Sequence, residues 1–176
     1  MSLIRSRLLS LPAPSITLAL GGIGTAYVFF ANIAEAQRGI IPLLNGRFGK
    51  LELGEKERVM LWNSYFDSAA KWIVSTSVLN SLLSFTTSYL HPSPNIRRLA
   101  LLSGIFSISI VPTTFLVGLL PINSRLKELT KAGVEVRRSE GRELVQGWEK
   151  RHALRIPLYA IAWGLNLVAV LLDGRV

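Results

Sequence analysis

The feature that most constrains the fold is an apolar run from Ser15 to Ala34, which carries no charged side chain. A helix of about 20 apolar residues can cross the hydrocarbon core of a bilayer, and a bilayer core admits such segments only as helices or closed barrels. Three comparable segments follow, so the sequence predicts membrane-crossing helices at about 15–34, 69–90, 99–120 and 154–172. We therefore expect an all-α fold in which residues 1–176 form a single domain, an integral membrane four-helix bundle.

The composition supports membrane partners and argues against several others. Hydrophobic residues make up 49% of the 176 residues and charged residues only 18%. The 20 Lys and Arg residues outnumber the 11 Asp and Glu residues and flank the apolar segments, so we expect contact with anionic lipid headgroups and no nucleic acid. The absence of Cys excludes a disulfide framework, thiol catalysis and Cys-ligated metals.

The first apolar run ends at Ala34-Glu35-Ala36, which looks like a signal-peptidase site. Because the apolar region is longer than the h-region of a usual signal peptide, we expect a retained first helix. Within this helix Gly21, Gly24 and Val28 form a small-residue face, which predicts close contact with another helix.

The two long connections are predicted to hold amphipathic helices at the membrane surface. In the stretch 55–67, Val59, Trp62 and Phe66 fall on one face and charged residues lie opposite. We expect Trp62 and Tyr65 to lie at headgroup level as aromatic belt residues.

Proline positions predict where the other helices turn or bend. The link His91-Pro92-Ser93-Pro94 cannot continue a helix and is short, so we expect the second and third helices, which it joins, to be antiparallel neighbours. Pro112 predicts a kink in the third helix, and Pro121 is expected to mark where that helix leaves the membrane.

The orientation prediction rests on the distribution of basic residues. An even number of crossings places both termini on one side, together with the few basic residues there: Arg5, Arg7, Arg97, Arg98 and Arg175. Most of the 20 basic residues lie in or beside the two long connections, so the positive-inside rule predicts that these connections face the cytoplasm. In a eukaryote the endoplasmic reticulum membrane is the expected location.

The last predicted helix carries an aromatic and polar stripe. Its members follow one another at spacings of three or four and therefore share one helix face: Trp148, His152, Arg155, Tyr159, Trp163 and Asn166. Such a face suits a partner or a cavity, while the apolar remainder suits lipid. Pro157 interrupts the stretch and predicts a kink that could rotate its two halves relative to each other.

A second polar face lies on the helix predicted at 69–90, formed by Ser77, Asn80, Ser84 and Thr87. These side chains either hydrogen-bond between helices as packing contacts or wall a cavity, with Asn80 as its strongest member. The sequence leaves both interpretations open.

One group of residues has the chemistry of a catalytic site. Asn123 follows the third helix on the side where Trp148, His152 and Arg155 begin the fourth, so these side chains can meet at the membrane interface. A neutral His in a hydrophobic pocket can act as a general base, and Arg155 and Asn123 could stabilise the resulting anion. Trp148 could stack on a planar aromatic substrate. The alternative is that Trp148 anchors in the interface, Arg155 reaches headgroups and His152 lies on the surface.

The two histidines of the chain, His91 and His152, are expected at opposite membrane faces. They could not share a haem or a zinc ion within one chain. Because the predicted crossings also contain no Asp or Glu, we expect no metal site.

The four-helix layout and two short motifs resemble the anthrone oxygenase-like family. The motifs are N-x-R-L and W-x-x-x-H-x-x-R, found here at Asn123, Arg125 and Leu126 and at Trp148, His152 and Arg155. The resemblance implies oxidation of a polyketide anthrone to the anthraquinone by O2, without a metal or organic cofactor. It also makes a hydrophobic aromatic small molecule the expected substrate.

The leading hypothesis is thus a cofactor-independent oxygenase with His152 as the base. Further substrate contacts are expected from the polar faces, at Asn80, Tyr159, Trp163 and Asn166. The alternative is a non-catalytic multi-pass membrane protein that binds a lipid or a protein partner, in which the same faces pack against helices without a cavity. A haem or quinone anchor is disfavoured by the separated histidines, and a homo-oligomer stays open.

Overall fold

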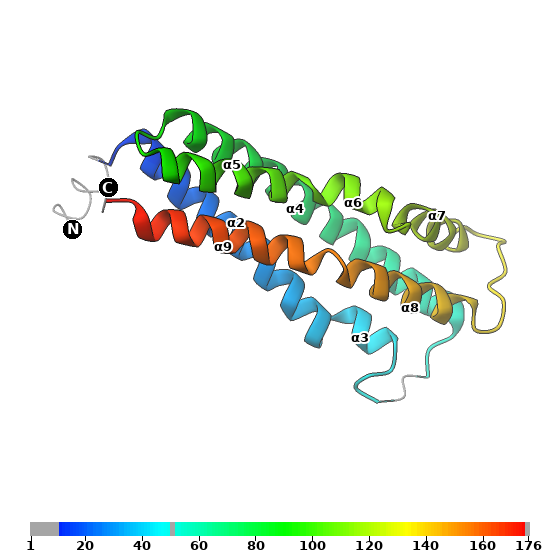
Figure 1. The fold of residues 1–176 in the computed structure, drawn as a ribbon. Coiled ribbons are helices and arrows are strands. Elements are labelled where there is room, and N and C mark those ends of the chain that lie inside the picture. The colour runs from blue at the N-terminus through cyan, green and yellow to red at the C-terminus, as the bar shows by residue number, and fades with distance from the viewer. Residues whose placement is uncertain (1–10, 50–51, 175–176) are drawn as a thin grey trace. The chain divides into compact units, whose positions relative to one another are not determined.

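The computed structural model describes residues 11–49 and 52–174, and these ranges contain helices and turns without a strand (Figure 1). The predicted all-α fold is therefore confirmed. In chain order the helices are α2 (Ala13–Arg38), α3 (Ile40–Leu44), α4 (Glu55–Leu90), α5 (Pro94–Ile108), α6 (Ile110–Leu116), α7 (Leu119–Leu129), α8 (Glu140–Ala153) and α9 (Ile156–Leu172).

Prolines set most of these boundaries. A proline lacks the N–H that would bond to the carbonyl four residues earlier, and its ring clashes with that carbonyl. Helices accordingly end four residues before a proline: α2 at Arg38 before Pro42, α4 at Leu90 before Pro94, α5 at Ile108 before Pro112, and α8 at Ala153 before Pro157. The predicted interruptions at Pro112 and Pro157 are confirmed.

Two stretches of the described chain are long and apolar enough to cross a membrane: Ala13–Leu44, which holds α2 and α3, and Glu140–Leu172, which holds α8 and α9. Counting the bent pair α5 and α6 as one broken span gives a third. The crossing predicted at 69–90 lies in α4, which is not among these candidates because its Ser, Thr and Asn residues lower its hydropathy. Arg5, Arg7 and Arg175, on which part of the orientation prediction rests, lie outside the described residues.

Residue contacts divide the chain into two compact units, which are described separately. Unit 1 takes its described residues from Met1–Val28, Thr76–Ser109 and Leu158–Val176, and unit 2 comprises those of Phe29–Ser75 and Ile110–Pro157. The chain alternates between the units along its length, because α2 and α4 each contribute one part to unit 1 and the other to unit 2.

In unit 1, segments of α2, α4, α5 and α9 pack against one another. Gly24 of α2 allows a close approach, since a Cβ there would lie 1.9 Å from Asn80 Oδ1 of α4. Thr17 and Thr87 join the same two helices through a 2.8 Å hydrogen bond between their hydroxyls. The small-residue face predicted on the first helix is therefore confirmed as a packing face.

Buried polar groups connect the other helices of unit 1. Ser81 Oγ donates to the Gly104 carbonyl at 2.9 Å, and Asn166 Nδ2 donates to Ser103 Oγ at 2.9 Å. Ser103 Oγ in turn donates to the Ala162 carbonyl at 2.8 Å. These bonds are packing contacts, because each joins two different helices. On the polar face predicted for the helix at 69–90, Thr87 and Ser84 likewise bond to other helices, whereas Ser77 and Asn80 line a small cavity.

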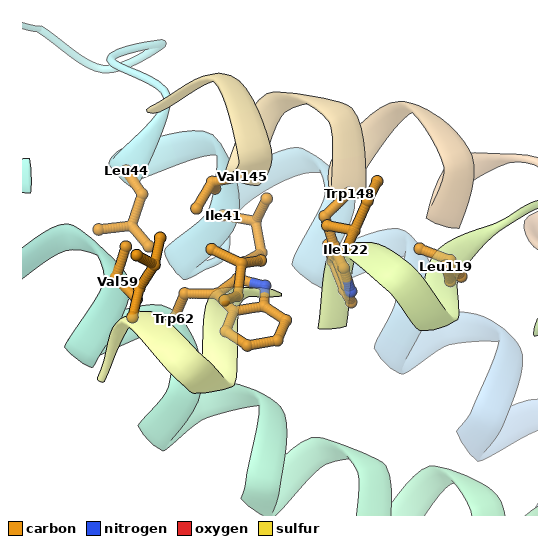
Figure 2. Close-up of a cluster of buried hydrophobic side chains, with 10 residues drawn as sticks. Ile41, Leu44, Val59, Trp62, Leu119, Ile122, Val145 and Trp148 are labelled. Atoms are coloured by element: carbon orange, nitrogen blue, oxygen red, sulfur yellow. The ribbon is translucent and has the colours of Figure 1, made fainter. Parts of the chain in front are cut away.

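Unit 2 has its own hydrophobic core, contributed by α3, α4, α7 and α8 (Figure 2). Trp62 is fully buried in it, and its ring stacks on Phe66 with centroids 4.8 Å apart. The prediction that Trp62 is an aromatic belt residue is wrong, because the helix predicted at 55–67 continues without a break into the next one as α4 and packs its apolar face inside the protein.

Candidate functional site

A cavity of about 110 Å³ lies within unit 2. Its wall is mostly apolar or aromatic, with Ala69, Ile73, Tyr65 and Phe66 contributed by α4. Four residues that the sequence predicted to meet line this cavity together: Asn123, Trp148, His152 and Arg155. Arg155 is the only residue with a formal charge among the described residues of the wall, so the site is an apolar chamber with one cation.

The polar groups of the cavity are connected by direct contacts. The His152 ring stacks on Trp148, with centroids 4.6 Å apart and an interplanar angle of 8°. Trp148 Nε1 donates to Asn123 Oδ1 at 2.9 Å. On the other side of the imidazole, His152 Nε2 lies 3.0 Å from Asn32 Oδ1. The indole, the imidazole and two amides therefore form one connected row.

Helix geometry explains how α8 presents these side chains. Trp148 and His152 are one turn apart in α8, which places their rings one above the other on the same face. Because Pro157 leaves the Ala153 carbonyl without its helical donor, α8 ends there, and Arg155 lies in the turn before α9, where its N–H bonds to the His152 carbonyl at 3.0 Å. Arg155 is nevertheless buried, with 8% of its surface exposed.

The start of α7 places Asn123. Gly118 adopts a left-handed conformation with φ of 68°, so the position favours glycine. Arg151 Nη1 donates to the Gly118 carbonyl and ties α8 to this turn. Pro121 lies in the first turn of α7, where its missing N–H costs no helical bond. The third helix, predicted to run to about residue 120, instead stops at Leu116, and a new helix that begins at Leu119 carries Asn123.

The remaining motif residues serve the structure of unit 2. Leu126 is fully buried in the core. Arg125 donates to Glu140 Oε1 at 2.7 Å and to Glu128 Oε2 at 2.9 Å. These hydrogen bonds to carboxylates raise the pKa of the Arg125 guanidinium, with Glu140 the larger cause. Arg125 does not line the cavity, so N-x-R-L combines one cavity residue with two structural ones.

A second cavity, of about 360 Å³, is also formed within unit 2. It shares Trp148 and His152 with the first cavity, and its wall includes Glu35, Arg47 and Lys150. The two cavities thus differ in character, because several ionic side chains line the second and one lines the first.

The four residues predicted as further substrate contacts belong to unit 1. Asn80 and Tyr159 line a separate cavity of only about 10 Å³. Asn166 is fully buried and bonded to Ser103, while Trp163 is half-buried. None of these four lines either of the two cavities described above.

Asn32 and Thr114 line the cavity although the sequence did not reveal either as a site residue, and Asn32 is the one that contacts His152. It belongs to the apolar run that predicted the first helix, and its partner His152 lies 120 positions away. No local spacing could reveal such a pair. The one available signal was an amide within a segment of membrane-crossing length, where a polar side chain is costly.

Among the residues that the structure describes, no group of three or more His, Cys, Asp or Glu side chains could hold a metal ion. His91 lies in unit 1. Its Nδ1 accepts a hydrogen bond from the Ser93 N–H, and its Nε2 lies 3.2 Å from Asp173 Oδ1. His91 and His152 therefore belong to different units and contact different partners.

The fold and the site together define a class, an all-helical protein with membrane-length apolar segments and an apolar chamber lined by His, Trp, Asn and Arg. Residues 62–165 match the family described as Anthrone oxygenase. Because the match spans more than half of the chain, the protein belongs to the anthrone oxygenase family, in agreement with the two motifs. No curated protein and no solved structure matches the chain.

Proposed function

We propose that this protein oxidises an anthrone-like aromatic polyketide to the quinone with O2, and that His152 is the base that begins the reaction. The observation that carries the proposal is the convergence of His152, Trp148, Asn123 and Arg155 on one apolar cavity, all within the residues that match the family. An oxygenase of this kind needs a dry, flat binding space, a base and a stabiliser for an anion.

The cavity wall suits an apolar planar substrate. Tyr65, Phe66 and Trp148 offer aromatic surfaces, and Ala69 and Ala70 leave room beside them. Aromatic rings prefer stacked or edge-to-face contacts with other rings, which would orient a flat tricyclic molecule. The apolar helices of the chain are compatible with a multi-pass protein in a lipid membrane, from which such a substrate could reach the site.

The proposed reaction starts with transfer of the acidic benzylic proton from carbon to His152, which leaves a carbanion whose charge is delocalised onto the substrate oxygen. The carbanion reduces O2 and binds it, and a proton completes a carbon-bound hydroperoxide. Removal of the second C–H proton then breaks the O–O bond and expels hydroxide, which leaves as water. One CH2 group and one O2 thus give one carbonyl and one water.

Arg155 and Asn123 are proposed to stabilise the anion. A guanidinium in an apolar cavity interacts more strongly with a developing negative charge than it would in water. Asn123 Oδ1 is occupied by the indole N–H, which can only donate, so the amide NH2 group of Asn123 is the part left to donate to the substrate oxygen.

The test is oxygen consumption by purified, metal-stripped protein with emodin anthrone. Uptake should exceed the spontaneous rate, and His152→Ala should reduce the catalysed rate by about 10²–10⁴-fold, the usual contribution of a general base. His91→Asn is the matched control, because it removes the other histidine and leaves the cavity intact. Uptake that survives in His152→Ala would refute the assigned base, and no uptake above background would favour the binding-protein hypothesis.

A finer proposal concerns location. The distribution of basic residues supports cytoplasmic long connections. For a eukaryote we propose the endoplasmic reticulum membrane as the location. Protease protection of tags placed at Gly133 would test the orientation, because this turn lies between α7 and α8.

A further inference from the structure

The amide of Asn32 determines which nitrogen of His152 can act as the base. His152 Nε2 lies 3.0 Å from Asn32 Oδ1, and a carbonyl oxygen can only accept a hydrogen bond. Nε2 must therefore carry the proton of a neutral imidazole, and the lone pair resides on Nδ1. We propose that Asn32 positions His152 and makes Nδ1 the atom that takes the substrate proton, an inference that rests on the proposed function.

The environment of Nδ1 supports this assignment. Nδ1 is buried and makes no hydrogen bond with any described residue. A buried acceptor without a partner is costly, and a catalytic role is one recognised explanation for it. Other buried polar atoms of the described chain, such as Asn166 Oδ1, also have no partner, so the assignment of Nδ1 rests mainly on the contact between Nε2 and Asn32. His152 lines the cavity, but Nδ1 itself has almost no accessible surface, so the proposal requires the ring or the wall beside it to shift when a substrate binds and brings its C–H proton to this lone pair.

The ring is also held against a flip that would exchange the positions of Nδ1 and Nε2. Stacking on Trp148 at an interplanar angle of 8° fixes the plane of the imidazole, and Asn32 fixes its direction within that plane. Trp148 is held in turn by its bond to Asn123. When His152 takes a proton, the imidazolium that forms keeps its Nε2–H bond to Asn32 Oδ1, as the base of a catalytic triad keeps the bond to the group that orients it.

Asn32 lies outside the part of the chain that matches the family, which is residues 62–165. It lies on α2 and is 5% exposed. An amide buried in a helix of membrane-crossing length is expensive unless it is bonded, so its bond to His152 gives a reason for its presence. The N-terminal helix would thus complete a site whose other polar members lie in the family region.

The first test is the tautomer of His152 in the unmodified protein, from ¹⁵N NMR of selectively labelled histidine, with His91→Asn used for assignment. The expected spectrum shows Nε2 with the shift of a protonated nitrogen and Nδ1 with that of an unprotonated one. The opposite pattern would overturn the proposal. Because this measurement needs no substrate, it reports the orientation of His152 even if anthrone oxidation is not the reaction.

The second test compares Asn32→Leu, which removes the acceptor at similar volume, with Asn32→Asp, which keeps it. Asn32→Leu should lose the single tautomer and lower kcat by about 10- to 100-fold, the size typical for loss of a group that orients a His. Asn32→Asp should retain the Nε2–H tautomer and most of the rate. Asn63→Leu, which removes an amide-to-carboxylate bond from α4 in the same unit, should change neither.

The outcomes separate the two proposals. If the wild type oxidises anthrone and Asn32→Leu keeps both the tautomer of His152 and the rate, the role of Asn32 is refuted and the proposed function stays intact. Anthrone left unoxidised by the wild type would refute the proposed function, whereas the tautomer would still report whether Asn32 orients His152.

Discussion

The two units of the chain bury polar side chains in different ways. In unit 1 the hydroxyls of Ser81 and Ser103 and the NH2 group of Asn166 bond to neighbouring helices, and the associated cavity is about 10 Å³. Asn166 Oδ1 and Ser107 Oγ are buried there without a hydrogen bond to the described residues. In unit 2 the polar groups line a cavity of about 110 Å³, and one of them, His152 Nδ1, is left without a hydrogen bond to the described residues. Both sets share the same helix-face pattern in the sequence.

A polar stripe in an apolar helix is ambiguous until its partners are known. Polar groups that bond across a helix pair replace water and stabilise packing. Polar groups that converge on an apolar cavity lower the stability of the fold, and they can be more reactive than ordinary side chains. This combination is typical of functional sites. Substitutions in the two units should therefore change different observables.

After that of His152→Ala, the largest effect is expected at Arg155. Arg155→Gln keeps much of the side-chain volume but removes the cation from the cavity wall, so kcat for anthrone should fall by about 10²–10³-fold, as when an oxyanion donor is removed. Steady-state oxygen uptake measures this. An unchanged kcat would show that the anion forms without help from Arg155 and would contradict the assignment of this cavity as the catalytic site.

The next effect concerns the packing unit. Asn166→Leu removes the donor to Ser103 and leaves that hydroxyl without its hydrogen bond from α9, so the free energy of unfolding should fall by about 1–3 kcal/mol. Thermal unfolding in detergent measures the loss. kcat should be unchanged just below the unfolding range, and a variant with normal stability but lost turnover would contradict the division between the two units.

The sequence predicted the helical fold and the members of the cavity better than it predicted helix boundaries. Pro157 and Pro112 could be interpreted directly, because a missing N–H interrupts any helix interior. Pro121 could not, since its effect depends on whether it falls inside a helix or in a first turn. Trp62 was misplaced because an amphipathic pattern does not distinguish a membrane surface from a protein core, and Asn32 was missed because its contact spans 120 positions.

A smaller effect should follow from Trp148→Phe. The change keeps a ring beside His152 but removes the indole N–H that holds the Asn123 carbonyl oxygen. Because the orientation of the Asn123 amide is no longer fixed, kcat should fall on the order of tenfold, the equivalent of one hydrogen bond. Asn123→Ala in the same background should add little, and a full additive loss would show that the two side chains act independently.

The smallest effect is expected in the charged exterior of unit 2. Lys127 pairs with Asp67 at 2.9 Å and lies over the Phe66 ring, but both members of the ion pair are about half exposed. Lys127→Met should therefore cost less than about 1 kcal/mol of stability, with a smaller difference at high salt. Thermal unfolding at low and high ionic strength checks this, and a change in kcat would place part of the site outside the cavity.

The most direct test of the central claim is a side-by-side measurement of oxygen uptake with emodin anthrone by the wild type, His152→Ala and Asn166→Leu. Our account predicts that His152→Ala loses the catalysed rate even though thermal unfolding shows that the variant is still folded at the assay temperature. It predicts that Asn166→Leu keeps the rate and unfolds at a lower temperature. Retained turnover in His152→Ala, or turnover lost in Asn166→Leu without a loss of stability, would contradict the account.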